Sequence, residues 1–200
     1  MSVAHDNDGE LTDAKRLIVR HAAALFRRKG FLGTSMRDIA DAVGMSKAGI
    51  YHHYPTKERL LQDIVGVGAD ALDAQLREVM DSGASTEDRL DCYFRSRMRT
   101  IAEYQDVLTV IWQERPTIGD GLFESVARRL ERYRAGVVEL IAEGQRSGVV
   151  RADLDAHLMA LAVDGMTGWA YLWYRDNGGQ TPEQIGGAFW SMLWDSMRSG

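Results

Sequence analysis

The 200-residue sequence predicts an all-α protein in which a small N-terminal unit precedes a larger helical domain. Apolar residues recur along most of the chain at the three- and four-residue spacing of a buried helical face. Glycine, proline and capping residues interrupt that spacing, and no stretch shows the alternation of β-branched and polar residues that is typical of strands. We therefore expect about nine helices and no sheet.

The most informative segment, from Ser35 to Pro55, predicts two short helices joined by a tight turn. Ser35 and Asp38 fit a capping box, in which each side chain accepts a hydrogen bond from an N–H group at the start of a helix. Gly44 follows where the chain leaves that helix, and Ser46 is placed to cap a second helix, which Pro55 ends. This order is typical of a helix-turn-helix, whose second helix enters the DNA major groove.

Charge is divided unevenly along the chain, whose net charge is −5. Residues 14–57 carry nine basic and two acidic side chains, whereas residues 1–13 carry a net −4 and residues 58–200 a net −8. Such asymmetry indicates a part that faces nucleic acid and a remainder with another task. A solvated basic face is the alternative, and the helix-turn-helix pattern favours DNA.

The other helices follow from apolar spacing, caps and breakers. We expect a disordered lead-in over 1–11, a helix-turn-helix domain over 12–56 with its motif at 35–54, and a ligand-binding and dimerisation domain over 57–200. Helices outside the motif are expected over 12–29, 57–80, 86–104, 106–114, 120–147, 154–175 and 181–198.

Composition disfavours several classes of protein. No run of about 18 apolar residues occurs, so a membrane-spanning helix is not expected, and the acidic first residues do not resemble a secretory signal. Cys92 stands alone, so neither an intrachain disulfide nor a cysteine-rich zinc site is expected. The sequence shows no paired carboxylates, no Ser/His/Asp arrangement and no glycine-rich phosphate loop, so an enzyme is not expected. We expect a cytoplasmic protein with no cofactor and no metal.

The last two predicted helices are apolar around most of their circumference. A helix of this kind must be covered on more than one side, and a second copy of the chain in a two-fold four-helix bundle is a suitable cover. An intramolecular core is the alternative. The residues expected at this dimer interface are Leu158, Leu161, Trp169, Ile185, Phe189, Met192 and Trp194.

The N-terminal segment, with its helix-turn-helix pattern, resembles the TetR family of bacterial transcriptional regulators. The stretch GFLGTSMRDIADAVGMSKAGIYHHYPTKERLL, at 30–61, follows the family's DNA-binding signature nearly position by position. Residues 113–155 and 173–185 are similar to a branch of the family that senses acyl-CoA or steroid-CoA thioesters. One departure lies at the cap of the fourth helix, where Thr56 is followed three residues later by Arg59 instead of the usual glutamate.

The resemblance implies a homodimer that binds double-stranded operator DNA, most simply a repressor released by a small hydrophobic or amphipathic effector, with a CoA thioester as a candidate. A transcriptional activator of the same fold is an alternative, and a nonspecific DNA-binding protein or an enzyme is a weaker one. The residues implied in DNA binding are Thr34, Ser35, Arg37, Ser46, Lys47, Ala48, Gly49, Tyr51, His52 and Lys57.

Within this set, Lys47 is expected to reach a guanine edge or a phosphate, and Tyr51 and His52 a phosphate or a thymine methyl group. Gly49 is expected to allow close approach of the backbone. For the effector, aromatic and methionine side chains of the second half predict an apolar pocket, although core packing explains them equally well. These residues are Phe94, Met98, Tyr104, Leu108, Ile111, Trp112, Tyr133, Met166, Trp169 and Trp173.

Overall fold

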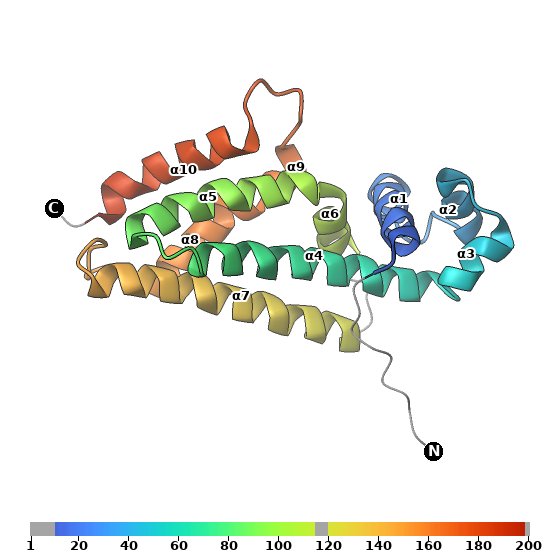
Figure 1. Ribbon diagram of the computed structural model, residues 1–200, viewed down its shortest axis with the longest axis horizontal. Coiled ribbons are helices and arrows are strands. Elements are labelled where there is room, and N and C mark those ends of the chain that lie inside the picture. Colours follow the sequence, from blue (N-terminus) through green and yellow to red (C-terminus); the bar gives the residue numbers. More distant parts are fainter. Residues whose placement is uncertain (1–10, 115–119, 199–200) are drawn as a thin grey trace, which may run out of the picture. The chain divides into compact units, whose positions relative to one another are not determined.

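The computed structural model describes residues 11–114 and 120–198, which are almost entirely helical (Figure 1). The predicted lead-in lies almost wholly outside these residues. The chain divides into two compact units, one ending at Ile64 and one beginning at Val65. We call them the N-terminal unit and the C-terminal unit. The division falls inside the long helix α4 (Lys57–Met80), which therefore contributes residues to both units.

The N-terminal unit contains α1 (Asp13–Lys29), α2 (Met36–Val43), α3 (Lys47–His53) and the first two turns of α4. Thr12 caps α1 by accepting a hydrogen bond from the Lys15 amide, and Gly30 follows the last residue. Each helix directs an apolar stripe inward, as the spacing predicted. The fully buried side chains of this unit are Ile18, Ala22, Ala23, Phe26, Ile39, Ile50, Tyr54, Leu60 and Ile64.

The C-terminal unit contains the rest of α4 and, within the described ranges, six further helices. These are α5 (Thr86–Glu103), α6 (Gln105–Gln113), α7 (Asp120–Arg146), α8 (Ala156–Gly168), α9 (Ala170–Trp173) and α10 (Pro182–Met197). Helix α10 packs along α5, and α7 packs against α8 (Figure 1). The core between them includes Tyr93, Phe94, Met98, Ile101, Val137, Leu140 and Ile141.

Helix ends match the predicted ends within a few residues where caps are local in sequence. Thr181 and Gln184 form the predicted capping box of α10, with Pro182 as the first helical residue. The expected helix over 154–175 differs, because Trp169 separates α8 from α9. Gly168 weakens the helix there, and the Thr167 hydroxyl donates to the Val163 carbonyl oxygen at 2.8 Å, a contact that bends helices. None of the described helices is long and apolar enough to cross a membrane.

Candidate nucleic-acid interface

Two side chains fix the start of α2. The Ser35 hydroxyl oxygen accepts a hydrogen bond from the Asp38 amide at 3.1 Å, and the Asp38 carboxylate accepts one from the Ser35 amide at 2.8 Å. The hydrogen bonds from Ser35, together with nearby Lys29, lower the pKa of Asp38 to about 2. The predicted capping box is therefore present, and its carboxylate stays ionised at neutral pH.

The turn between α2 and α3 depends on one left-handed residue. Gly44 has φ 70° and ψ 28°, and its N–H group donates to carbonyl oxygens at the end of α2. A side chain at this dihedral angle would be strained. Ser46 then caps α3 by accepting a hydrogen bond from the Gly49 amide at 3.0 Å, so the helix-turn-helix predicted from the sequence is formed.

Helix α3 has one buried and one exposed face. Ile50 and Tyr54, expected in the core, are fully buried, and the Tyr54 hydroxyl donates to Asp63 of α4 at 3.0 Å. Burial, followed by the charge of Asp63, raises the pKa of Tyr54, so this hydroxyl stays a donor. The exposed residues at the start of the helix and along its outer face are Ser46, Lys47, Ala48, Tyr51 and His52.

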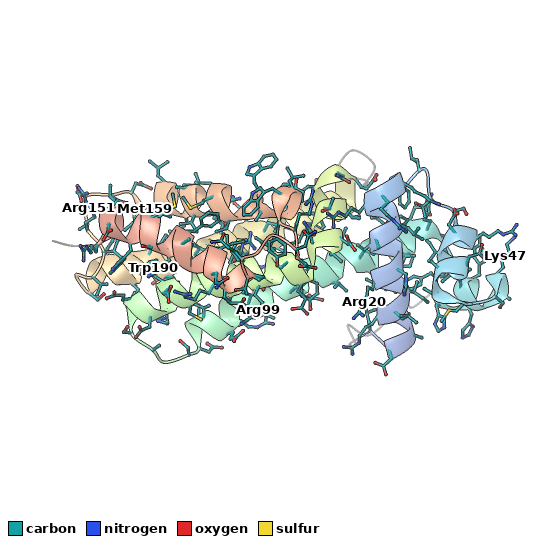
Figure 2. The ribbon with its side chains drawn as sticks, turned by 90° about the horizontal axis from the view of Figure 1, so that it is seen from above. Arg20, Lys47, Arg99, Arg151, Met159 and Trp190 are labelled. Carbon is teal, nitrogen blue, oxygen red and sulfur yellow. The ribbon has the colours of Figure 1, made fainter. Side chains whose placement is uncertain are left out.

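Figure 2 shows the Lys47 side chain extending away from the helices of its unit. Arg37, on α2, is also solvent-exposed and lies 3.9 Å from Asp41, an exposed pair that contributes little to stability. Ser35 is exposed as well, whereas Gly49 is half-buried. Eight of the ten predicted DNA contacts thus lie at or beside the free face of the helix-turn-helix, with cationic groups that suit phosphate and base edges.

Two of the ten residues predicted to contact DNA make contacts within the N-terminal unit instead of facing solvent. The Thr34 side chain is buried, and its hydroxyl donates to the Gly30 carbonyl oxygen at 2.9 Å, so this hydroxyl is used within the unit and is not exposed for a phosphate as expected. The Lys57 ammonium donates to the carbonyl oxygens of Phe31 and Thr34 and lies over the Phe31 ring. This anchoring contact joins residues 23 and 26 positions apart, and no short-range pattern signals it.

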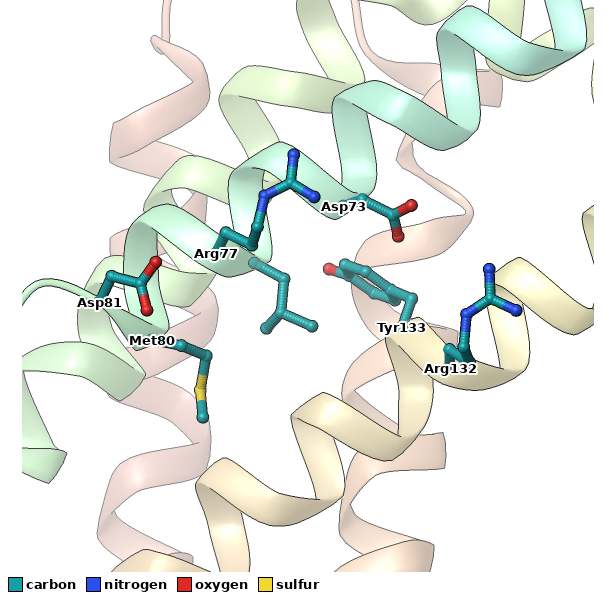
Figure 3. A pocket seen from close by; sticks show the side chains of 7 residues that line it. Asp73, Arg77, Met80, Asp81, Arg132 and Tyr133 are labelled. Atoms are coloured by element: carbon teal, nitrogen blue, oxygen red, sulfur yellow. The ribbon is translucent and has the colours of Figure 1, made fainter. Parts of the chain in front are cut away.

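The predicted effector-pocket residues differ in exposure, and most of them do not line the pocket described below. Trp112, Trp169 and Trp173 are exposed, and Tyr104 and Met166 are half-buried. The other predicted residues, Phe94, Met98, Leu108, Ile111 and Tyr133, are buried. A pocket of about 310 Å³ lies between α4 and α7 (Figure 3).

Tyr133 is the one predicted pocket residue that lines this pocket. The full lining is Asp73, Leu76, Arg77, Met80, Asp81, Arg132 and Tyr133. The aromatic pattern of the sequence does not indicate this pocket, because four of its seven lining residues are charged, and charged residues at helical spacing predict a solvated surface.

The predicted dimer residues lie on α8, at Trp169 between α8 and α9, and on α10, and they differ in exposure. Leu158, Trp169 and Met192 are 65%, 60% and 68% exposed. Leu161 is exposed too, whereas Ile185, Phe189 and Trp194 are half-buried. Trp194 stacks on Trp190 with ring centroids 4.5 Å apart. Exposed apolar side chains mark an interaction surface where they form a continuous patch, so the dimer interface stays a prediction.

Comparison with known proteins decides the family. Residues 18–64 match the family described as bacterial regulatory proteins, tetR family, and residues 83–197 match the tetracyclin repressor-like C-terminal domain. The second match alone spans more than half of the chain. This chain belongs to the TetR family. It is therefore a helix-turn-helix transcriptional regulator and not an enzyme.

Several TetR relatives resemble it over nearly their whole length. HTH-type transcriptional repressor KstR2 of Mycobacterium tuberculosis is 29% identical over 180 residues, which is 89% of this chain and 90% of KstR2. The structure of that ketosteroid regulator superposes with a TM-score of 0.86, at 25% identity, over 96% of this chain and 98% of that one.

A second solved relative carries ligands. The crystal structure of AibR in complex with isovaleryl coenzyme A and operator DNA has a TM-score of 0.78 at 31% identity, over 91% of this chain and 98% of AibR. AibR therefore binds both operator DNA and an acyl-CoA.

Proposed function

We propose that this TetR-family protein is a dimeric repressor that leaves its operator when a CoA thioester binds its C-terminal unit. The exposed face of α3 around Lys47 carries the DNA-binding part of the proposal. The repressor activity and the effector class are supported by KstR2, whose name describes a repressor, and by AibR, which binds isovaleryl-CoA.

In the bound state, α3 lies in the major groove. Lys47, at its first turn, meets a base edge or a phosphate, and Tyr51 and His52 contact the backbone or a thymine methyl group. The half-buried Gly49 and the small Ala48 let the helix approach closely. Ser35 and Arg37 hold phosphates from α2, while Lys57 keeps the turn before α2 in place.

Two copies supply the two recognition helices that paired half-sites require. The surface formed by Leu158, Leu161, Trp169 and Met192, with the half-buried side chains of α10, provides a self-complementary apolar face for a two-fold bundle. Its most exposed members gain the most from burial.

The effector acts through α4, because this helix belongs to both units. A ligand that binds the DNA-free conformation more tightly shifts the population toward it, and it shifts it only by that difference in affinity. Movement of α4 then alters the placement of α2 and α3 on DNA.

The DNA-binding proposal is tested with Lys47→Ala on operator fragments selected from genomic DNA. Affinity for the operator should fall about 5- to 150-fold, the range of one good base or phosphate contact, while the mass of the assembly in solution stays unchanged. Arg128→Ala removes another exposed cation, in the C-terminal unit, and serves as the control. Unchanged operator affinity in Lys47→Ala would remove Lys47 from the interface.

The effector proposal is tested by adding isovaleryl-CoA to the protein–operator complex. Release of the DNA at a ligand concentration that leaves a nonspecific complex unaffected supports a CoA thioester effector. Free coenzyme A is the control for the acyl group. Operator occupancy that does not respond to acyl-CoA thioesters counts against this class of effector.

A further inference from the structure

A positive charge lies buried among the helices of the C-terminal unit. Arg97 of α5 is 8% exposed, and its guanidinium carbon lies 5.0 Å from the centroid of the Tyr133 ring. Among the described residues, none accepts a hydrogen bond from Nε or Nη1 of Arg97. Arginine stays charged in proteins, so this is a buried cation with two nitrogen atoms that donate no hydrogen bond within the described ranges.

The polar neighbours of Arg97 are hydrogen-bonded to one another, and Tyr133 also accepts a hydrogen bond from Arg97. Gln75 Nε2 donates to the Ser96 hydroxyl at 2.7 Å, and Tyr133 Oη lies 2.9 Å from Gln75 Oε1 and 3.0 Å from Tyr93 Oη. Because each hydroxyl has one proton, Tyr133 donates to Gln75 and accepts from Tyr93. Burial raises the pKa of both tyrosines, so both are neutral and supply no negative charge to balance Arg97.

Asp164 of α8 is the acidic group that interacts electrostatically with Arg97, and it also pairs with Arg134. Arg134 Nε donates to Asp164 Oδ2 at 3.2 Å, while Asp164 Oδ1 is buried without a hydrogen bond in the described part of the chain. Arg97 and Arg134 together therefore exceed Asp164 by one positive charge. A buried charge without a full counter-charge destabilises a fold, and such groups cluster at functional sites.

The described pocket reaches this cluster through one residue. Tyr133 lines the pocket between α4 and α7 (Figure 3), and the same ring packs against Arg97. The pocket is thus one side chain away from the guanidinium. A ligand that displaces the Tyr133 ring gains access to these two nitrogen atoms.

We propose that Arg97 binds a carboxylate at the buried end of the effector, so that the preferred effector is an acyl compound whose acyl chain ends in a carboxylate. A carboxylate supplies two acceptor oxygens and the negative charge that the cluster lacks. This inference deepens the proposed function, on which it rests for the CoA end of the ligand.

The test compares two CoA thioesters that each carry a five-carbon acyl group. Glutaryl-CoA ends in a carboxylate and isovaleryl-CoA ends in methyl groups. By titration calorimetry on the full chain, the wild type should bind glutaryl-CoA at least tenfold more tightly, and Arg97→Met should remove the preference while retaining isovaleryl-CoA binding. Equal binding by the wild type, or a preference that survives in Arg97→Met, overturns the proposal.

A second pair of probes separates this proposal from the CoA proposal. Isovalerate and isovaleramide share a carbon skeleton and differ in charge. Suppose that neither CoA thioester binds. If isovalerate then raises the melting temperature of the wild type more than isovaleramide does, and has no such effect on Arg97→Met, the anion site is supported and the CoA effector is contradicted. If the protein prefers the carboxylate in neither pair of ligands, the proposed anion site is wrong.

A purely structural role for Arg97 predicts different results. In that case Arg97→Met lowers the melting temperature of the unliganded protein, and its effect is strongly coupled to that of Asp164→Asn in a double-mutant cycle. We expect instead no loss of stability in Arg97→Met and a retained carboxylate preference in Asp164→Asn. Arg97→Lys keeps the charge and should keep a reduced preference; if neither Arg97 variant folds, the residue is structural and the proposal is wrong.

Discussion

The ammonium group of Lys57 joins the start of α4 to the turn before α2. Its nitrogen lies 2.6 Å from the Phe31 carbonyl oxygen and 2.7 Å from that of Thr34, and 4.3 Å from the centroid of the Phe31 ring. These contacts use two of its three donors within the N-terminal unit. Lys57 therefore positions the helix-turn-helix, whatever further contact it makes with DNA.

Lys57→Met should lower the free energy of unfolding of the N-terminal unit by about 1–2 kcal/mol, because hydrogen bonds to charged groups are stronger than neutral ones and this group is half-exposed. Operator affinity should fall with little change in its dependence on salt. Thermal unfolding and salt-titrated binding measure the two effects.

Lys47→Met is the matched control, because Lys47 is exposed at the start of α3. It should leave unfolding unchanged and reduce the salt dependence of operator binding by about one phosphate contact. If Lys57→Met instead behaved like Lys47→Met, Lys57 would be a phosphate contact with no positioning role.

Contacts between residues close in the sequence could be predicted from it, whereas contacts between distant residues could not. The Ser35–Asp38 and Thr181–Gln184 capping boxes join residues three apart, so the type and spacing of the residues were enough to predict them. Lys57 and Arg97 are different, since each owes its surroundings to residues distant in sequence. A cation at helical spacing predicts a solvated face, and the packing that buries Arg97 is visible only in three dimensions.

The effector pocket shows the same limit. Aromatic residues such as Phe94 and Trp173 predict either a core or a pocket, and spacing alone does not distinguish the two. In the structure Phe94 packs against Trp190 in the core, while Trp173 is exposed and contacts the ring of Phe189 on α10. Tertiary contacts therefore decide which of these aromatic side chains serve the core.

The Asp38 capping box predicts a dependence of stability on acid. The pKa of Asp38 lies near 2 in the folded protein, below its ordinary value of 3.8. A carboxyl group with a lowered pKa contributes stability that is fully present above the unfolded pKa and is lost as pH falls through the folded one. The N-terminal unit should therefore lose stability between about pH 4 and pH 2.

Asp38→Asn should be less stable than the wild type at neutral pH, and the difference between the two should shrink across that window. Thermal unfolding from pH 5 to pH 2 measures it. Asp41→Asn removes an exposed carboxylate from the same helix and should leave the acid dependence as in the wild type. A wild-type profile in Asp38→Asn would contradict the role of the capping box.

The proposed dimer surface is best tested at its most exposed residues. Leu158→Glu combined with Met192→Glu places two charges on the apolar face of α8 and α10, where a partner would have to desolvate them. We expect a monomer by light scattering, with helical content unchanged. Trp194→Glu is a poorer test, because Trp194 stacks on Trp190 and its loss disturbs the core as well.

Leu32→Glu provides the control, since Leu32 is 82% exposed and lies in the N-terminal unit. It should leave the oligomeric state unchanged. A dimer mass that persists in the double variant would show that the apolar face of α8 and α10 is not the interface.

Gly186 and Gly187 are adjacent on α10, but replacement by alanine should affect stability differently at the two positions. A Cβ atom at Gly186 would lie 2.5 Å from the Phe94 carbonyl oxygen and 2.7 Å from the Arg95 Cα atom, and backbone on α5 has no rotamer with which to yield. At Gly187 the nearest atoms belong to the flexible end of the Arg95 side chain. Gly186→Ala should therefore destabilise the C-terminal unit by about 1–3 kcal/mol, the usual cost of overpacking.

Gly187→Ala should be close to neutral, because displacement of Arg95 is offset by up to about 1 kcal/mol of improved helix propensity. That gain is common to both variants, so the difference in their chemical unfolding midpoints isolates the contact between α5 and α10. Equal midpoints would mean that α10 shifts away from α5 at little cost. The apolar face of α10 would then be held less firmly than a fixed dimer surface requires.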